Sequence, residues 1–417
     1  MADAFDADVV IAGAGMAGAT LTLGLARAGL RCVLIDPQPF EAQVAPSFDG
    51  RASAVAYAAF RQWRVLGAGA ALEPDAQRIE QILVTDGHAP GAAAGRGRGF
   101  HLHFDAAEIA DRADGEPLGY MLENRLIRAG LAAAVRDAGI QVLAPARVAA
   151  LEVDARAATV RLEDGRALRA ALVVGAEGRG SVIRRAAGIG AVGWDYPQTA
   201  VVATVGLERD HAGVAYEYFL PGGPFAILPL TGRRASLVWT EPTARAEALK
   251  AASPEAFHAH LARRFGDFLG EARIEGAVFT YPLSMQLAKR LAAPRVALLG
   301  DAAHGVHPIA GQGLNLGLKG AAALAETLVD AARLGEDIGS LAVLERYARW
   351  RRFDTAMLAA GMDAFVHLFS NANPVLRLAR GLGMAAVNRI GPARRMFMQE
   401  AGGGLGDLPR LLRGEAL

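Results

Sequence analysis

Residues 8 to 36 constrain the fold most, because they read as one strand–helix–strand unit. A short apolar strand, Val9–Ala12, leads at once into Gly13-Ala-Gly15-Met-Ala-Gly18, and apolar residues continue at helical spacing until Gly29. A second strand then ends in an acid. In this context the glycines permit a tight turn, approach of a diphosphate and close helix packing, and the acid takes ribose hydroxyls. The expected dinucleotide ligands are Gly13, Gly15, Met16, Ala17, Gly18 and Asp36.

A second unit of the same kind lies at residues 295–320. The apolar strand Val296–Leu299 stops at Gly300, Asp301 follows, and Gly311-Gln312-Gly313 opens a long apolar helix. A carboxylate there can accept hydrogen bonds from ligand hydroxyls, and the free N–H groups of the helix start favour negative charge. The alternative on this stretch alone is a plain connection whose glycines serve only tight turns.

Between these units, a buried strand pattern at residues 170–174 runs through Gly175-Ala-Glu177-Gly178 into a short helix. The remaining segments, above all residues 200–240, are rich in strands and turns. The pattern predicts an α/β protein with an α+β insert: a Rossmann-like domain assembled from separated segments, an inserted antiparallel sheet domain and a helical C-terminal region. The expected nucleotide-binding domain comprises 1–79, 105–190 and 286–345, the sheet domain 80–104 and 191–285, and the helical region 346–417.

Composition excludes several classes of function. The net charge of +1 gives no argument for a nucleic-acid partner, and no apolar run approaches the roughly 18 residues of a membrane-spanning helix. The N-terminus is acidic and lacks the basic start of a signal peptide, and the single Cys32 fits a reducing compartment, so the protein is expected in the cytoplasm. His101 and His103 share a strand face without a third ligand, so no metal site is expected.

Three motifs taken together resemble the aromatic-ring hydroxylases, which are single-chain FAD-dependent monooxygenases. They are the Gly13–Gly18 turn with Asp36, the Gly175–Gly178 motif, and Gly300-Asp301-Ala-Ala-His304. The resemblance covers the whole chain. The resemblance is most specific to the ubiquinone-biosynthesis hydroxylases, nearest to those acting on 2-polyprenyl-6-methoxyphenol. The segments that carry this narrower resemblance are residues 307–318, 119–125 and 368–374.

This resemblance implies FAD as the cofactor. Asp301 would bind the ribityl hydroxyls, Pro308 would lie against the flavin, and the helix start at residues 311–314 would stabilise the anionic reduced ring. Arg51 and Asn124 match positions that contact FAD, although Arg51 could also be a solvated surface arginine. Glu177 stands where the family usually has Asp, which leaves its role open. The implied FAD ligands beyond the first turn are Arg51, Asn124, Glu177, Gly300, Asp301, Pro308, Gly311, Gln312, Gly313, Leu314 and Asn315.

The chemistry implied by the resemblance is carried by the cofactor. Reduced FAD, with NAD(P)H or another donor as the electron source, reacts with O₂ to a C4a-hydroperoxide that a phenolic ring attacks. No protein nucleophile is required; His304 and His307 flank the flavin loop as candidates to polarise the phenol or as loop-structural residues. The implied substrate is a polyprenylated phenol of ubiquinone biosynthesis, and the expected pocket wall contains Tyr216, Tyr218, Phe225 and Leu228.

The C-terminal region combines basic and apolar residues. From Ser370 onward there are seven arginines against three acids. Such a segment can lie on an anionic membrane surface, here the inner face, or pack as a helix bundle with solvated arginines. Two alternative functions stay open: a hydroxylase of a soluble aromatic compound, and a non-catalytic FAD-binding subunit of a quinone-biosynthesis assembly.

Overall fold

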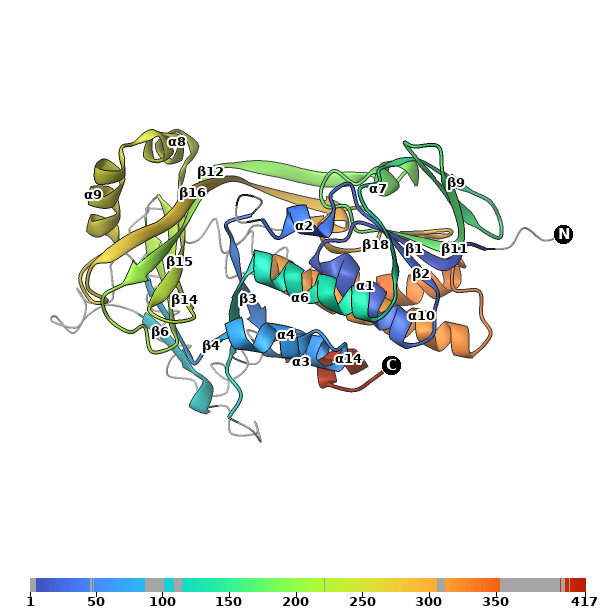
Figure 1. Ribbon diagram of the computed structural model, residues 1–417, viewed down its shortest axis with the longest axis horizontal. Helices are drawn as coiled ribbons and strands as arrows, with labels where there is room; N and C mark the ends of the chain where they lie inside the picture. Colours follow the sequence, from blue (N-terminus) through green and yellow to red (C-terminus); the bar gives the residue numbers. More distant parts are fainter. Residues whose placement is uncertain are drawn as a thin grey trace.

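The computed structural model describes residues 5–45, 47, 49–86, 101–108, 115–220, 222–305, 312–352, 398, 402–404 and 406–417. His307, Pro308 and Gly311 lie outside these residues, as does most of the region beyond 352. A mainly parallel sheet with helices occupies one end of the molecule and an antiparallel sheet the other, joined by two long strands (Figure 1).

The parallel sheet has its first two strands in the predicted unit. β1 pairs in parallel with β2 on one side and with β11 on the other, so that Val9 lies opposite both Cys32 and Leu172. The strand order is β17-β18-β11-β1-β2-β8, with β17 antiparallel. Their bounds are β1 Ala7–Ala12, β2 Cys32–Ile35, β8 Gln141–Leu143, β11 Ala167–Gly175, β17 Ala292–Ala293 and β18 Val296–Leu298.

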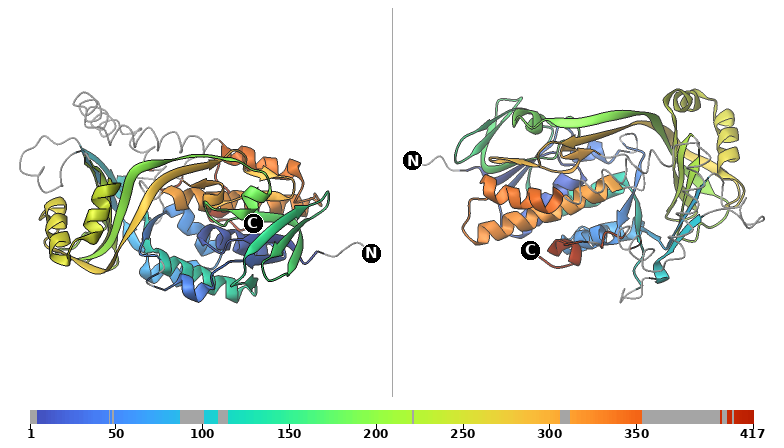
Figure 2. Two further views of the ribbon diagram at one scale, coloured as in Figure 1. Left: turned by 90° about the horizontal axis from the view of Figure 1, so that it is seen from above. Right: turned by 180° about the vertical axis from the view of Figure 1, so that it is seen from behind.

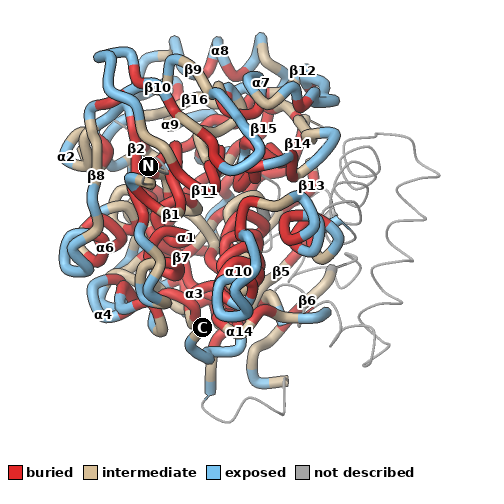
Figure 3. Tube along the Cα trace, turned by 90° about the vertical axis from the view of Figure 1, so that its right-hand side faces the viewer, coloured by how far each residue is buried: buried red, intermediate tan, exposed pale blue. Residues whose placement is uncertain are grey.

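Alternation along β1 builds a core on each face of this sheet. Val9 and Ile11 belong to the larger core, formed with the helices below the sheet in Figure 1, and Val10 and Ala12 belong to the smaller one above it. Figure 3 shows the buried residues concentrated along β1, β11, α1 and α10. The lower layer contains α1 Met16–Arg27, α3 Tyr57–Val65, α4 Gly69–Leu72, α6 Asn124–Asp137, α10 Gln312–Arg333 and α14 Arg410–Arg413. The upper layer contains β9 Val148–Val153, β10 Ala158–Leu162 and α7 Val182–Ala186.

The antiparallel sheet has the order β19-β16-β12-β15-β14-β13-β5-β6. Two helices cover its outer face, where Phe225, Trp239 and Phe257 form an aromatic core. The strands are β5 Gln81–Asp86, β6 His101–Asp105, β12 Ala191–Leu207, β13 Val214–Leu220, β14 Gly223–Leu230, β15 Arg234–Pro242, β16 Ala272–Ala288 and β19 His304–Gly305, and the helices are α8 Thr243–Ala251 and α9 Pro254–Phe265.

A small third sheet, β3-β7-β4, lies against the inner face of the antiparallel sheet, where Met121 packs with Leu230 and Ala215. Its strands are β3 Ala52–Ala56, β4 Gln77–Ile79 and β7 Gly119–Glu123. Short elements complete the chain: α2 Phe40–Gln43 and the 3-10 turns Glu73–Asp75, Ala106–Glu108 and Gly300–Ala302.

The fold class predicted from the sequence is confirmed, and two local predictions need correction. The sequence pattern of residues 48–66 predicts a loop running into a helix, but residues 52–56 form β3, because their backbone pairs with β7. The sequence pattern predicts a strand only at residues 200–205, but β12 has 17 residues because it pairs with β16 along almost its full length. Figure 2 shows these two strands running together from one part of the molecule to the other. Among the helices in the described residues, none is both long and apolar enough to cross a membrane.

Candidate functional site

The N-terminal end of α1 has the geometry of a diphosphate site. Gly15 is the N-cap residue, and no side chain caps the helix. A Cβ on Gly13 would lie 2.3 Å from the Ala176 oxygen and one on Gly18 would lie 2.0 Å from the Gly13 oxygen, so packing requires both glycines. A Cβ on Gly15 would meet nothing within 4 Å. Protein packing therefore does not explain Gly15, whereas close approach of an anionic ligand to uncapped helix N–H groups does.

The Asp36 side chain connects the end of β2 to the glycine turn by hydrogen bonds. Its carboxylate accepts the backbone N–H of Ala14 at 2.7 Å and that of Gln38 at 2.8 Å. Burial raises the pKa of Asp36, although the two backbone hydrogen bonds and the charges of Arg128 and Arg147 act in the opposite direction. Each carboxylate oxygen has a second lone pair, so the group can also accept a ribose hydroxyl.

The Glu177 side chain caps the N-terminal end of α7. Its carboxylate accepts the N–H groups of Val182 and Ile183, each at 3.2 Å, and the hydroxyl of Ser181. Burial raises its pKa, and these hydrogen bonds oppose the shift. The longer side chain that replaces the family's usual Asp thus caps a helix beside the Gly13 turn.

Asp301 lies where three glycine-bearing segments meet. The Ala17 Cβ is 3.4 Å from an added Cβ at Gly300 and 3.5 Å from one at Gly317, so the α1 turn, residue 300 and α10 are in contact. The Asp301 side chain is half exposed, and its Oδ2 is 3.7 Å from the Arg179 Nε. Loss of solvent around the carboxyl raises the pKa of Asp301, while the charges of Arg179 and Arg51 act to lower it. Arg179, which was not among the predicted site residues, also donates to the Ser284 carbonyl at 3.1 Å.

Asp49 is the residue that the sequence motifs missed most clearly. Its buried carboxylate receives Arg51 through two hydrogen bonds, Nε at 2.8 Å and Nη2 at 2.9 Å. Arg128, Asn124 and the Tyr281 hydroxyl donate to it as well, at 2.9, 3.0 and 3.3 Å. Burial alone would raise the pKa of Asp49, but the hydrogen bonds and charge of Arg51 and the bond from Asn124 hold it well below its ordinary value. The Asp-Gly-Arg spacing was the available signal.

Arg51 is held at this junction rather than solvated freely. Its guanidinium lies 4.8 Å from the centre of the Tyr281 ring. Burial acts to lower the pKa of Arg51, but Asp49, Tyr281 and Asp301 outweigh this and raise it. A fixed cation beside Asp301 suits a phosphate or the polar edge of a flavin.

The two predicted asparagines have internal partners. Asn124 donates to Asp49 and accepts the Ser53 hydroxyl at 2.6 Å. Asn315, near the start of α10, accepts the Ala56 N–H and donates to the Ala54 carbonyl, each at 2.8 Å, and so binds α10 to β3. Both side chains position the segments around Asp301.

The aromatic residues predicted to line the substrate pocket lie on the outer face of the antiparallel sheet, away from the candidate site. Tyr218 and Phe225 are fully buried in the core beneath α8 and α9, with Tyr216 packed against it. Leu228 alone of the four packs on the inner face, toward β3 and β7. The inner face also carries Tyr281, which reaches Asp49.

His304 is enclosed in β19, opposite Leu287 of β16. It is 1% exposed, and its Nδ1 has no hydrogen-bond partner within the described residues. Burial lowers the pKa of His304 to about 4, with a further contribution from the Arg351 charge. The imidazole is therefore neutral at pH 7 and has little access to a ligand.

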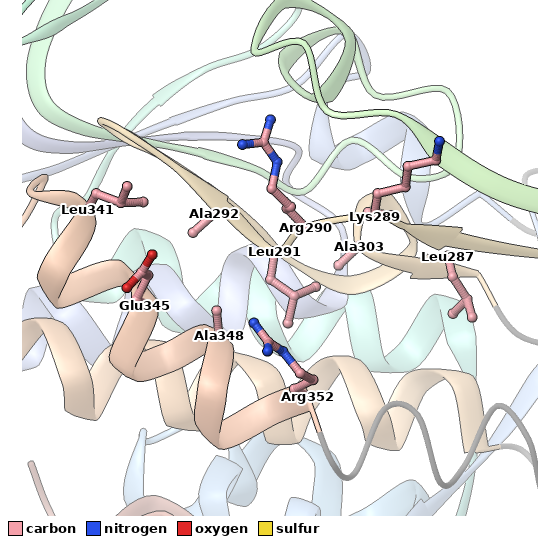
Figure 4. Close-up of a pocket in the computed structure, with 11 residues that line it drawn as sticks. Leu287, Lys289, Arg290, Leu291, Ala292, Ala303, Leu341, Glu345, Ala348 and Arg352 are labelled. Atoms are coloured by element: carbon pink, nitrogen blue, oxygen red, sulfur yellow. The ribbon is translucent and has the colours of Figure 1, made fainter.

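A separate cavity of about 320 Å³ lies between the end of β16 and helical residues 341–352 (Figure 4). Ala292 and Ala303 line it from the strand side, and Ala348 and Arg352 line it from the helix. Of the predicted FAD ligands that the structure describes, none lines it. No group of three or more His, Cys, Asp or Glu in the described residues is arranged to hold a metal.

Comparisons with known proteins agree with this geometry. Residues 6–357 match the family model described as an FAD binding domain. The chain is 47% identical over 415 residues to ubiquinone hydroxylase UbiL of Rhodospirillum rubrum, covering 99% of this chain and 94% of the relative. It is 35% identical to the 3-demethoxyubiquinol 3-hydroxylase of Escherichia coli, covering 94% and 98%. The fold resembles that of p-nitrophenol 4-monooxygenase PnpA from Pseudomonas putida, with a TM-score of 0.78 at 20% identity and coverage of 96% and 99%.

Gly15→Ala should separate ligand binding from folding. The Gly15 backbone has φ −63°, which alanine adopts readily, and the added Cβ meets no protein atom. We expect an unchanged thermal midpoint for the apoprotein but FAD affinity weaker by roughly 10–100-fold, about 1.4–2.8 kcal/mol. The contrasting variant Gly18→Ala should lower the thermal midpoint itself. Flavin fluorescence titration and thermal unfolding measure the two effects, and unchanged FAD affinity in Gly15→Ala would contradict the assignment.

His304 should make the fold sensitive to mild acid. Its pKa falls from 6.5 to about 4 on folding, so between these values the unfolded chain binds a proton that the folded chain does not. Stability should therefore decrease as the pH falls from about 6.5 to 4, by about 3 kcal/mol in total, and change no further through this group below pH 4. Urea unfolding at several pH values measures this, and His304→Gln should lose that component while exposed His258→Gln keeps it. An imidazole NMR titration of the unmodified protein with a midpoint near 6.5 would contradict the prediction without any variant.

Proposed function

This chain belongs to the family of FAD-dependent monooxygenases that includes the ubiquinone hydroxylases, and from that premise we propose that it hydroxylates the ring of a polyprenylated phenol in ubiquinone biosynthesis. One observation carries the proposal: the α1 turn, Asp301 and the start of α10 meet at Ala17, beside the inner face of the antiparallel sheet. When bound, FAD supplies the activation of O₂ and the transfer of one oxygen atom.

The residues around Ala17 are suited to hold FAD in an extended form. The uncapped α1 start at Gly15 would take the diphosphate, Asp36 the adenosine ribose and Asp301 the ribityl hydroxyls. Arg51, fixed by Asp49, adds positive charge near Asp301. The start of α10, from Gln312 through Gly313 and Leu314, would present N–H groups to the ring.

The inner sheet face suits an apolar substrate. Ala200, Val202, Leu283 and Met285 form a buried cluster there with Leu316 of α10, next to Tyr281. Such a surface excludes water from a reactive centre and favours burial of a hydrocarbon tail. A phenol bound here would lie between this face and the segments that hold FAD.

Loss of the protein from cells tests the proposed substrate. We expect one under-hydroxylated prenylphenol to accumulate and ubiquinone to fall, because the chemistry of the next step requires the missing hydroxyl. Mass spectrometry of quinone intermediates identifies the compound and hence the ring position. Re-expression should restore ubiquinone, whereas a Gly15→Ala variant with weakened FAD binding should restore less. Unchanged ubiquinone would contradict the proposal, and restoration by a protein that consumes no O₂ would favour a non-catalytic role in an assembly.

We also propose that the C-terminal region brings the protein to the inner face of the membrane, where a prenylated substrate resides. Arg410 and Arg413 pair with acids in the structure. The supporting observation is therefore the group of five arginines between Arg377 and Arg395, a stretch that contains no acid and is rich in apolar residues. Flotation of the full chain with vesicles should show binding to phosphatidylglycerol-containing membranes at low salt and weaker binding at 0.5 M salt. Equal recovery with pure phosphatidylcholine vesicles, or none with either lipid, would contradict the electrostatic contact.

A further inference from the structure

Glu217 lies at the middle of β13 between two residues that face away from it. Tyr216 and Tyr218 pack into the core under α8 and α9. Because successive side chains of a strand point to opposite faces, Glu217 belongs to the inner face, the same face as Ala215. An acid therefore stands on the surface that the proposed substrate would contact.

The pairing register places Glu217 in one cross-strand row. Directly paired residues share a face. Glu217 lies opposite Ala226, Ala226 opposite Val238, Val238 opposite Val202, and Val202 opposite Phe279. On the other side Glu217 lies opposite Val84. All the other members of this row are apolar, so Glu217 is its single ionisable group.

The rows on either side of the Glu217 row show which segments pack against this part of the inner face. In one, Tyr281 lies opposite Ala200 and reaches Asp49. Phe279, at the end of the row of Glu217 itself, fills the space beside Gly50 with its ring. In the other, Leu228 packs with Met121 of the small sheet. The row of Glu217 therefore runs between the loop that positions Arg51 and the surface covered by β3 and β7.

Glu217 has no hydrogen-bond or ion-pair partner in the described part of the chain. The other charged and titratable side chains described on this face have partners elsewhere. Arg234 pairs with Glu123 at 3.1 Å and with Glu275 at 2.9 Å, and the Tyr281 hydroxyl donates to Asp49. Burial among apolar neighbours, with no compensating charge, raises the pKa of Glu217 to about 7. A carboxyl of this kind titrates where a general base works best.

We propose that the Glu217 carboxylate is the catalytic base that accepts the phenolic proton of the ring being hydroxylated. In this step the substrate O–H bond breaks, its electron pair stays on the ring oxygen, and the proton bonds to a Glu217 oxygen. The resulting phenolate is a stronger carbon nucleophile than the phenol. After oxygen transfer the ring carbon gives its proton to solvent, its electron pair restores the aromatic ring, and the ring oxygen regains a proton from Glu217. These proton transfers change no oxidation state, and the oxidation of the ring is supplied by O₂ and reduced FAD as in the proposed function. The assignment rests on the proposed function and adds its proton acceptor.

Single-turnover hydroxylation tests the assignment without knowledge of the electron donor. FAD-loaded enzyme is reduced with dithionite in the presence of 2-farnesyl-6-methoxyphenol and mixed with O₂, and the product is quantified by mass spectrometry from pH 5.5 to 9. We expect the rate of the unmodified enzyme to rise through a pKa near 7. Glu217→Gln should reduce it by roughly 10²–10⁴-fold and abolish that limb, and Glu217→Asp should recover part of both.

Controls separate this role from a structural one. Glu247→Gln on α8 removes an exposed acid from the same domain and should leave rate and pH profile unchanged. FAD affinity and the substrate dissociation constant of Glu217→Gln should stay within about threefold of the unmodified enzyme. A Glu217→Gln enzyme that keeps both rate and pH limb would overturn the assignment while leaving the proposed function intact. Failure of the unmodified enzyme to hydroxylate the probe, or unchanged ubiquinone in cells lacking the protein, would instead overturn the proposed function.

Discussion

The buried carboxylate of Asp49 is the interaction on which the arrangement of the site depends. It receives donors from three places in the chain: Arg51 in its own loop, Asn124 and Arg128 on α6, and Tyr281 on β16. The first two belong with the nucleotide-binding layers and the third with the antiparallel sheet. Breaking a buried, multiply bonded charge leaves its partners unsatisfied, which is strongly destabilising, so this contact fixes the sheet against the loop that carries Arg51.

Most of the cofactor end could be predicted from sequence, because its signals are local. The Gly13–Gly18 turn, Asp36 and Asp301 depend on spacing within one strand–helix unit, and close packing explains the glycines at positions 13 and 18. The Asp49–Arg51 pair had a local signal in the Asp-Gly-Arg spacing, but Asp49 joins the layers of the molecule through residues about 75 to 230 positions away. Sequence spacing carries no record of such a contact. Likewise, nothing local shows that Asn315 bonds to β3.

The error about the aromatic residues has a different cause. Both faces of the antiparallel sheet are apolar, one under α8 and α9 and the other toward α10, so polarity along β13 and β14 does not reveal which face meets a ligand. Bulk suggested Tyr218 and Phe225, and these fill the outer core. The informative residue was the acid between the tyrosines, since an isolated carboxyl on an apolar face is the exception that packing does not explain.

The carboxylates of the molecule differ in what surrounds them, and this difference assigns their roles. Asp36 and Glu177 accept backbone N–H groups, and Asp49 and Asp301 face arginines. At these four carboxyls, hydrogen bonds and opposite charges act on the pKa against the effect of burial, and their partners within the protein fit them to hold structure or ligand. Glu217 is set among apolar neighbours without such compensation, so a small change in its surroundings moves its proton equilibrium across the working pH. A phenol bound beside Glu217 would supply a hydrogen-bond donor that the described residues do not, and proton transfer could then begin once the ring is bound.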